Sequence, residues 1–312
     1  MIIVINLNMA IDKTLKIDEF KKGYIYRKNP DVIVAGGKGV NVARALKLFV
    51  KDYLLIGFLC GHTGKIIDDM LRKEKFNFKM IYQSFGESRT CLSVIDKNGI
   101  ATDINEEGSV IVDNSKKKFV NLFSSLVKKS NIVSISGRTP LGIDKSFYSN
   151  LIFKAKQTQA KVFVDLSGKA LLDCLNAGVY CVKINAIEFL ELASVPPTPT
   201  NLKKIYFSYH KRGLRKLIVT NKEKPVLAVT ENGVYRAYPP KIPNFISGVG
   251  AGDSFMAGFI YSEVKGYSDE KSIALGISFA LSDCKSLGAG IVDKKEIMRY
   301  FDKVRILKLE AL

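Results

Sequence analysis

The chain has 312 residues, of which 47% are hydrophobic, so it can bury a large α/β core and is not expected to be disordered. Its formal net charge of +18 comes from scattered lysines and arginines, without a basic tail, which favours a lysine-rich surface over a nucleic-acid footprint. No apolar run reaches the roughly 18 residues that span a membrane. Five widely spaced cysteines and two histidines argue against a zinc site and for reduced thiols in a cytoplasm.

Short β-rich runs alternate with helical patterns along the chain. Strands are predicted at Ile2–Leu7, Leu54–Leu59, Ile132–Ile135, Val162–Val164, Val179–Val182 and Leu217–Thr220. Helices are predicted after the Gly36-Gly37 turn and at Ser115–Lys129, Asp144–Thr158, Leu202–Arg212, Phe255–Val264 and Glu270–Lys285. This alternation predicts an α/β fold in which helices cover both faces of a mainly parallel central sheet.

Two stretches break the alternation. Thr14–Ala35 and Met80–Ile104 are mostly β-type, and we expect them to pair as a small separate sheet that acts as a lid. The whole chain, 1–312, is then one domain, with the lid formed from about 12–35 and 80–110. We expect one apolar face on this sheet, buried by closure over a ligand and by a second copy of the chain. The residues assigned to that face are Ile25, Val32, Val34, Cys91, Leu92 and Val94.

The segment Gly248-Val249-Gly250-Ala251-Gly252-Asp253 leads directly into a helical pattern. Its glycines allow a ligand to approach the backbone closely, and the free N–H groups of the first helical turn attract anions. A carboxylate beside an anion site would repel the anion. Its presence is explained if Asp253 removes a proton from a hydroxyl while the amides hold the phosphoryl group that this hydroxyl attacks. A glycine-rich turn with a stabilising first-turn aspartate is the alternative that this segment alone leaves open.

A second glycine-rich element, Ala35-Gly36-Gly37-Lys38-Gly39-Val40-Asn41, precedes another predicted helix. Lys38 stands where a cation can meet a phosphate. The element is neither a Walker A loop nor a dinucleotide fingerprint, because the spacing of both motifs is absent. Taken alone, a double-glycine turn before a helix is more often structural than functional.

Together these elements resemble the ribokinase-like (pfkB) carbohydrate kinases. The matching segments, in family order, are 6–12, 36–43, 136–142, 183–188 and 250–253, and the resemblance extends from residue 2 to about 300. Lys38 in the double-glycine motif and the segment Asp165-Leu166-Ser167-Gly168 look like the branch of 1-phosphofructokinases and tagatose-6-phosphate kinases. The resemblance implies a three-layer α/β/α domain with a small β-sheet lid, and phosphoryl transfer from ATP to a ketohexose monophosphate.

The resemblance also implies roles for individual residues. Asp253 matches the catalytic base, and Gly250, Ala251 and Gly252 match the anion hole for the γ-phosphoryl group. Asp12, Gly36, Gly37 and Asn41 match the sugar-binding positions, while Lys38 and Arg89 match contacts to the phosphate already on the sugar. Lys183, Asn185 and Thr220, together with Gly250 and Gly252, match the nucleotide side, and Glu188 matches the residue that orients Mg²⁺ through water. A homodimer through the lid is common in the family.

Two departures from the family pattern leave alternatives open. The loop Thr220-Asn221-Lys222-Glu223-Lys224-Pro225 lacks the usual glycines, which leaves the phosphate donor open. Arg138 stands where the branch usually has serine, and it either binds a substrate phosphate or occludes the pocket. The rival functions are a 6-phosphofructokinase-like or nucleoside kinase of the same family, and a non-catalytic ligand- or nucleic-acid-binding protein. Lys38 and Arg89 argue against an uncharged nucleoside, because both cations would lack partners.

Overall fold

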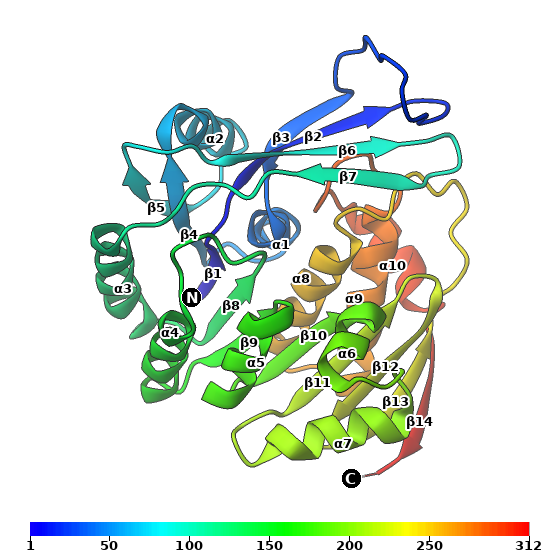
Figure 1. Ribbon diagram of the computed structural model, residues 1–312. Coiled ribbons are helices and arrows are strands. Elements are labelled where there is room, and N and C mark those ends of the chain that lie inside the picture. Colours follow the sequence, from blue (N-terminus) through cyan, green and yellow to red (C-terminus); the bar gives the residue numbers. More distant parts are fainter. Residues whose placement is uncertain (312) are drawn as a thin grey trace.

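The computed structural model describes residues 1–311 and contains one large and one small β-sheet (Figure 1). The large sheet runs in the order β14 (Arg305–Glu310), β13 (Gly233–Tyr238), β12 (Lys224–Thr230), β11 (Lys216–Asn221), β10 (Cys181–Asn185), β9 (Lys161–Asp165), β8 (Ile132–Ser136), β1 (Ile2–Asn6), β4 (Tyr53–Cys60) and β5 (Phe78–Gln83). Strands β11 to β5 are parallel, and β12, β13 and β14 extend the sheet as antiparallel strands. The carboxyl ends of the parallel strands therefore meet along one edge, where open α/β sheets bind ligands.

Helices cover both faces of this sheet (Figure 1), as predicted. One face carries α1 (Lys38–Leu46), α2 (Gly61–Lys73), α8 (Ala251–Val264), α9 (Asp269–Asp283) and α10 (Lys294–Phe301). The other carries α3 (Asp113–Val127), α4 (Lys145–Gln157), α5 (Gly168–Ala177), α6 (Ala186–Ala193) and α7 (Pro199–His210). Each face has its own apolar core, so the parallel strands are buried on both sides and are almost continuously hydrophobic. The chain is thus an α/β/α three-layer protein.

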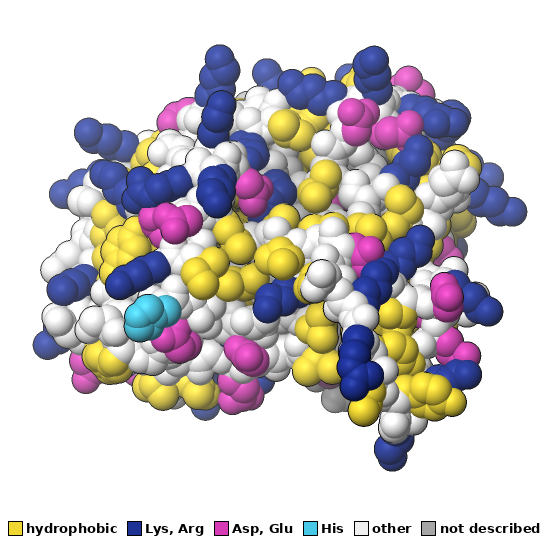
Figure 2. All heavy atoms as spheres, turned by 90° about the horizontal axis from the view of Figure 1, so that it is seen from above, with side chains coloured by type: hydrophobic (Ala, Val, Ile, Leu, Met, Phe, Trp, Pro, Cys, Tyr) yellow, Lys and Arg dark blue, Asp and Glu magenta, His cyan; other side chains and the backbone are white. Residues whose placement is uncertain are grey.

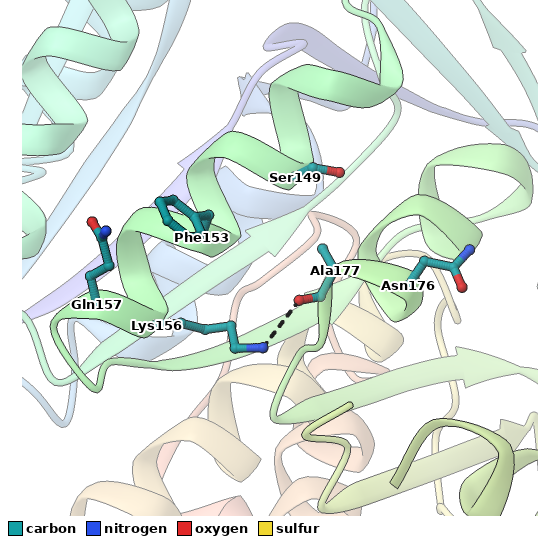
Figure 3. A pocket seen from close by; sticks show the side chains of 6 residues that line it. All are labelled: Ser149, Phe153, Lys156, Gln157, Asn176 and Ala177. Carbon is teal, nitrogen blue, oxygen red and sulfur yellow. Dashed lines mark hydrogen bonds between the residues drawn. The ribbon is translucent and has the colours of Figure 1, made fainter. Parts of the chain in front are cut away.

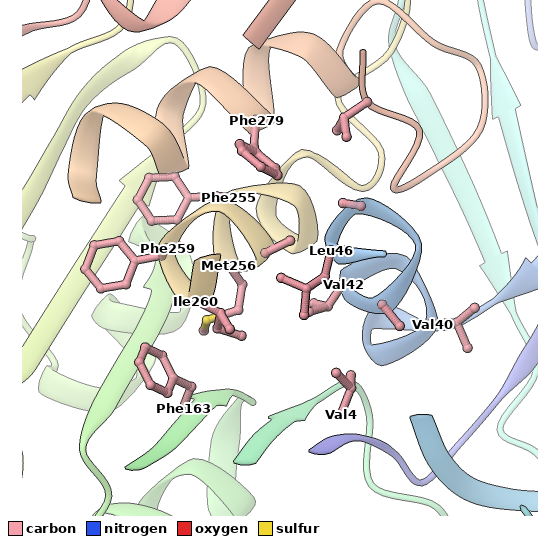
Figure 4. Packing of buried hydrophobic residues seen from close by; sticks show 14 of the residues in the cluster. Val4, Val40, Val42, Leu46, Phe163, Phe255, Met256, Phe259, Ile260 and Phe279 are labelled. Atoms are coloured by element: carbon pink, nitrogen blue, oxygen red, sulfur yellow. The ribbon is translucent and has the colours of Figure 1, made fainter. Parts of the chain in front are cut away.

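Helix α8 is held in the core by apolar side chains around most of its circumference. Figure 4 shows Phe255, Met256 and Phe259 of α8 among side chains of α1, α9 and the sheet. The Phe255 and Phe259 rings stack with their centroids 6.0 Å apart, and both side chains are fully buried. Burial of each such ring contributes roughly 1.5–3 kcal/mol. This packing fixes the N-terminus of α8 at the carboxyl edge of the large sheet.

The small sheet consists of β3 (Val32–Gly36), β2 (Ala10–Lys16), β6 (Arg89–Ile95) and β7 (Ala101–Asn105), in that order. It lies across the top of the molecule in Figure 1. The predicted stretches overlap all four strands, although β2 begins earlier, at Ala10, and two details of the prediction were wrong. Residues 78–83 form β5 in the large sheet, and residues 17–31 contain no strand. An apolar β-type run does not reveal which sheet it will join, because both sheets select the same residue types.

The prediction of a single apolar face on the small sheet was also wrong. Val34 and Cys91 lie opposite Asp12 in the neighbouring strands and therefore share its face. Leu92 lies opposite Lys13, so Leu92 and Val94 point to the other face, since successive side chains of a strand alternate. Ile25 lies outside the sheet and is 77% exposed.

Several boundaries differ from the predicted ones. The strand predicted at Val179–Val182 runs from Cys181 to Asn185, because α5 ends at Gly178 with a left-handed φ of 89° and the chain then has to re-enter the sheet. Helices α2, α5, α6 and α10 and strands β12, β13 and β14 were not predicted. Within residues 1–311, no helix is both long enough and apolar enough to cross a membrane.

Candidate active site

The N-terminus of α8 presents the predicted base. Gly250 caps the helix with a φ of 87°, a conformation that favours glycine, and no side chain caps the first turn. Ala251 and Asp253 donate their N–H groups to turn carbonyls at 3.3 and 3.0 Å, whereas no acceptor lies within reach of the Gly252 N–H among the described residues. The Asp253 side chain is buried. An unpaired amide therefore stands beside a carboxylate at the positive end of a helix dipole.

A row of alternating charges adjoins this turn. A Cβ atom on Gly252 would stand 2.7 Å from Lys183 Nζ, so the ammonium group lies directly against the glycine backbone. Lys183 Nζ is 2.6 Å from Oδ2 of Asp165, and the other oxygen, Oδ1, is 2.9 Å from Lys38 Nζ. Lys38 Nζ also lies 3.6 Å from Oε1 of Glu188. The row joins the ends of β9 and β10 to the first residues of α1 and α6.

Two members of this row, Asp165 and Lys38, are held in their charged forms by their neighbours. Burial alone would raise the pKa of Asp165, but Lys183 and Lys38 outweigh it and lower that pKa. Burial opposes the charge on Lys38, but Asp165 and Glu188 raise the pKa of the ammonium above its ordinary value. The Lys38 ammonium is therefore held in its charged form at the edge of the site, with the Lys183 side chain on the other oxygen of Asp165. Such cations stabilise a transferring phosphoryl group.

Asp253 differs from Asp165 because no cation contacts it directly. Burial, reinforced by the nearby charge of Asp165, raises the pKa of Asp253 to about 7. Its Oδ2 accepts a hydrogen bond of 2.9 Å from Nδ2 of Asn41, on α1. A carboxylate with a pKa near neutrality is suited to accept a proton from a hydroxyl.

Asn185 and Glu188 occupy the start of α6, where they form a capping box. Asn185 Oδ1 accepts from the amides of Ile187 and Glu188, while Glu188 Oε2 accepts from the Asn185 amide at 2.8 Å. Glu188 Oε1 remains turned toward the charge row. Thr220 lies beside Asn185 in the sheet register and donates to the Ile184 carbonyl at 3.4 Å. Lys183 and Asn185, the two predicted nucleotide-side residues on β10, thus lie at the same sheet edge as Asp253.

Asp12 and Arg89 lie in neighbouring strands of the small sheet. Asp12 Oδ2 accepts from the Gly37 amide at 3.3 Å, and its carboxyl group fills the space where a side chain on Gly36 would stand. Burial raises the pKa of Asp12, whereas the Gly37 amide and the charge of Arg89 oppose that rise. Arg89 is buried and donates to the carbonyls of Asn8 and Glu106 at 3.3 and 3.4 Å. The double-glycine turn is therefore packed directly against the strand that carries Asp12.

Arg138 does not join this cluster. Its side chain is 58% exposed and forms an ion pair of 2.9 Å with Glu107. The loop after β11 is also simpler than the family pattern implies. Lys222 and Glu223 form a tight hairpin turn between β11 and β12, with a positive φ of 50° at Lys222.

Two residues of the cluster were not predicted as site residues. Asp165 was noticed only as part of a family motif, yet it holds both lysines; its position at the carboxyl end of a predicted parallel strand was the available signal. Arg44 donates to Oδ1 of Asn41 at 3.0 Å. Its three-residue spacing from Asn41 on a predicted helix places the two on one face.

The structure contains an open groove elsewhere. A groove of about 670 Å³ lies between α4 and α5 and is lined by Ser149, Phe153, Lys156, Gln157, Asn176 and Ala177 (Figure 3). Lys156 donates to the Ala177 carbonyl at 3.3 Å, and no carboxylate lines the groove. Without a candidate base, this groove lacks the chemistry of the sheet edge and is not the active site.

Comparisons with known proteins identify the family of the chain. Residues 3–295 match the model of the pfkB family of carbohydrate kinases. The chain is 32% identical to the 1-phosphofructokinase of Bacillus subtilis over 89% of this chain and 90% of that protein. It is 24% identical to a tagatose-6-phosphate kinase of Staphylococcus epidermidis over 99% and 100%, respectively. A crystal structure of a possible 1-phosphofructokinase from Thermotoga maritima superposes with a TM-score of 0.88 at 24% identity, covering 99% of both chains.

The family match spans nearly the whole chain and confirms the resemblance drawn from the glycine-rich motifs. Membership of this kinase family implies ATP as the co-substrate. The chain belongs to the pfkB family of carbohydrate kinases and is a phosphotransferase that acts on an alcohol group.

Proposed function

We propose that this protein transfers the γ-phosphoryl group of ATP to a hydroxyl of a ketohexose monophosphate, either fructose 1-phosphate or tagatose 6-phosphate. The observation that carries the proposal is the buried Asp253 carboxylate at the N-terminus of α8, beside the unpaired Gly252 amide and the Lys183 ammonium. The similarity to the B. subtilis and S. epidermidis kinases supports the choice of acceptor class.

In the proposed reaction, Asp253 accepts the proton of the acceptor hydroxyl while its oxygen attacks the γ-phosphorus. The new O–P bond forms as the bond from that phosphorus to the β-phosphate oxygen breaks, and ADP leaves. The Gly252 amide, Lys183 and Lys38 oppose the negative charge on the transferring group. The resemblance implied a contact between Lys38 and the phosphate already on the sugar; we propose this role instead because Lys38 pairs with Asp165, 2.9 Å away, and lies 3.6 Å from Glu188.

Asp12 and Arg89 are proposed to bind the sugar phosphate. Asp12 offers a carboxylate that accepts hydrogen bonds from sugar hydroxyls, and Arg89 offers a planar guanidinium that matches a phosphate. Arg89 is buried, and its two hydrogen bonds, to Asn8 and Glu106, go to neutral backbone carbonyls rather than to a carboxylate. A phosphate on the sugar would supply the missing negative partner.

Mg²⁺ is proposed to accompany ATP. Among residues 1–311 there is no group of three or more His, Cys, Asp or Glu side chains that could hold a metal by themselves. A single carboxylate such as that of Glu188 fits Mg²⁺, which is commonly bound by one or two carboxylates together with waters and substrate phosphates. Glu188 would hold the ion through water with the oxygen that the capping box leaves available. When bound, the ion offsets charge on the phosphates.

A homodimer through the outer face of the small sheet is proposed as well. Ile33, Leu92 and Ile104 lie in one cross-strand row on the face opposite Asp12, and Ile33 and Ile104 are 47% and 56% exposed. Light scattering should detect a particle twice the 34.6 kDa of one chain, and Ile104→Glu should halve it. Ile66→Glu, on α2 and equally exposed at 47%, is the control that should stay dimeric. A wild-type particle of one chain would overturn this part.

Nucleic-acid binding is not favoured by the charge distribution. Figure 2 shows lysine and arginine side chains dispersed over the face seen from above, with acidic and apolar side chains between them. A nucleic-acid footprint would gather cations into a stripe or patch.

The test is steady-state kinetics with MgATP and fructose 1-phosphate, tagatose 6-phosphate and fructose 6-phosphate. One of the first two should give the highest kcat/KM, and Asp253→Asn should lower turnover by about 10²–10⁴ while the protein still folds. Asp69→Asn, an exposed aspartate on α2, is the matched control and should keep wild-type turnover. Highest activity with fructose 6-phosphate would replace the proposed acceptor, and near-full turnover of Asp253→Asn would remove the proposed base.

A further inference from the structure

Arg44 is buried behind the proposed base and is fully engaged in hydrogen bonds. Its side chain on α1 is 5% exposed. The guanidinium donates to both carboxylate oxygens of Glu74, at 2.7 and 3.0 Å, just beyond the end of α2. It also donates to Oδ1 of Asn41 and to the Ala289 carbonyl, both at 3.0 Å, and to the Ala35 carbonyl. The bidentate pair with Glu74 fixes the plane of the guanidinium, and the plane fixes its other donors.

The contact with Arg44 decides which way the Asn41 amide faces. A guanidinium carries donors and no acceptor, so the amide atom that meets Arg44 must be the oxygen. The amide nitrogen is then on the opposite side, where it donates to Oδ2 of Asp253 at 2.9 Å. If the amide were reversed, an oxygen would face the Asp253 carboxylate and an N–H₂ group would face the arginine, and both contacts would be repulsive.

We propose that Arg44 is a positioning residue for catalysis, which acts by holding the Asn41 amide so that its nitrogen faces Asp253. The inference rests on the proposed role of Asp253 as the base. The path runs from Glu74 through Arg44 and Asn41 to Asp253, each link being a hydrogen bond of 3.0 Å or less. Arg44 touches neither substrate nor phosphate in this scheme.

The same guanidinium also ties together the two backbone segments on either side of the base. Ala35 precedes the double-glycine turn that contacts Asp12, and Ala289 packs against Gly250, where an added Cβ would stand 2.5 Å from the Ala289 Cβ. Arg44 thus holds the sugar side and the anion-hole side at a fixed separation. Displacements of about 1 Å between reacting groups cost about 10²-fold in rate.

The test measures the acidic limb of the pH profile of kcat/KM in four proteins: wild type, Arg44→Met, Asn41→Ala and the double variant. The Asn41 amide lowers the pKa of Asp253, so loss of the correctly turned donor should move the limb to higher pH. The expected shift is about one pH unit in each single variant, the size of one hydrogen bond to a charged group. In the double variant the shift should be no larger than in Asn41→Ala alone.

Non-additivity separates positioning from a direct charge effect. Asp165, Lys38 and Lys183 also act on the titration of Asp253, and so does Asp283 on α9, but all four stay unchanged in these variants. If Arg44 acted only through its charge, its effect would add to that of Asn41→Ala. An additive shift, or no shift in Arg44→Met, would overturn the proposal.

Two further variants guard against a folding artefact. Like Arg44, Arg72 is paired with a carboxylate, that of Asp68 at 2.6 Å, but it is exposed. Arg72→Met should therefore leave the acidic limb at the wild-type pH. If Arg44→Met does not fold, Glu74→Gln keeps the guanidinium charge but weakens its anchor. It should shift the limb in the same direction by less, and the shift should vanish in the Asn41→Ala background; a shift that persists there would overturn the proposal. If Asp253→Asn were active, the proposed function would fail first, whatever the result for Arg44.

Discussion

The carboxyl edge of the large sheet and the small sheet beside it contribute to the site in different ways. At the large sheet, Asp165, Lys183 and Asp253 are at least nine-tenths buried; Asp165 and Lys183 pair with each other, and Asp253 accepts from the Asn41 amide. In the small sheet, β7 is exposed at every residue, and Asp12 and Arg89, which are proposed to bind the sugar phosphate, come from its two central strands. The comparison teaches that the groups proposed for phosphoryl transfer are fixed by the core, while those proposed to recognise the sugar lie in a sheet with an exposed edge strand.

The largest expected effect concerns the buried charges at the carboxyl edge of the large sheet. Asp165→Asn should lower the free energy of unfolding by about 3–5 kcal/mol, because two lysines lose a fully buried partner. Turnover of the folded fraction should fall by about 10²-fold or more as both ammonium groups move. Denaturant titration and kcat/KM measure the two effects. Asp113→Asn, an aspartate 84% exposed in its pair with Lys116, should cost less than about 1 kcal/mol, and equal losses in both variants would contradict the burial argument.

Gly252→Ala tests the contact between the anion hole and Lys183. The added methyl carbon would stand 2.7 Å from Lys183 Nζ, so the ammonium must move while the backbone stays. We expect kcat/KM to fall by about 10²-fold with little loss of stability. Gly248→Ala is a close control in the same loop, because its Cβ would meet only Phe245 at 3.9 Å. Similar kcat/KM values for the two variants would show that the position of Lys183 does not affect the reaction.

Arg89→Met tests the recognition side. The KM for the sugar phosphate should rise roughly 10- to 100-fold with a much smaller change in kcat, because one charge-assisted contact is lost. Arg27→Met, in the exposed loop before β3, should leave both constants unchanged. A fall in kcat with an unchanged KM would move Arg89 from substrate binding to the chemical step.

The smallest effect concerns pH, where activity and stability should move in opposite directions. Below pH 7, kcat/KM should fall by about tenfold per unit as Asp253 becomes protonated, since its pKa is raised to about 7. Burial likewise raises the pKa of Asp283 to about 7. Both groups bind protons more tightly in the folded protein, so the stability they contribute is complete at low pH and is lost as the pH rises toward 7.

Denaturant titrations across this range check the second half of that prediction. The free energy of unfolding of the wild type should decline from about pH 4 to pH 7, and Asp283→Asn should decline less steeply, because one of the two titrating carboxyl groups is gone. Identical slopes for the two proteins would show that Asp283 is ionised in the folded state.

The parts of the fold that could be predicted are those with a strong local signal. Strands such as β1 and β8, buried on both faces, appear as continuous apolar runs. Asp253 was recognisable because glycine, which alone tolerates the backbone at 250, precedes a carboxylate and a helical pattern. Strand β5 was assigned to the wrong sheet, and the face of Leu92 was misjudged, because register depends on partners distant in sequence.

By itself, the amino-acid sequence determined the α/β architecture, the kinase family and the two glycine-rich turns that carry the site. These features are local, since they follow from hydrophobic period, backbone freedom and short motifs. Only the tertiary structure decided that Asp165 joins Lys38 to Lys183, that Arg138 turns to the surface and that Arg44 orients Asn41. Each of these depends on side chains brought together from separate strands and helices, or on how a helix face packs, and the energy of a buried charge is set by those neighbours.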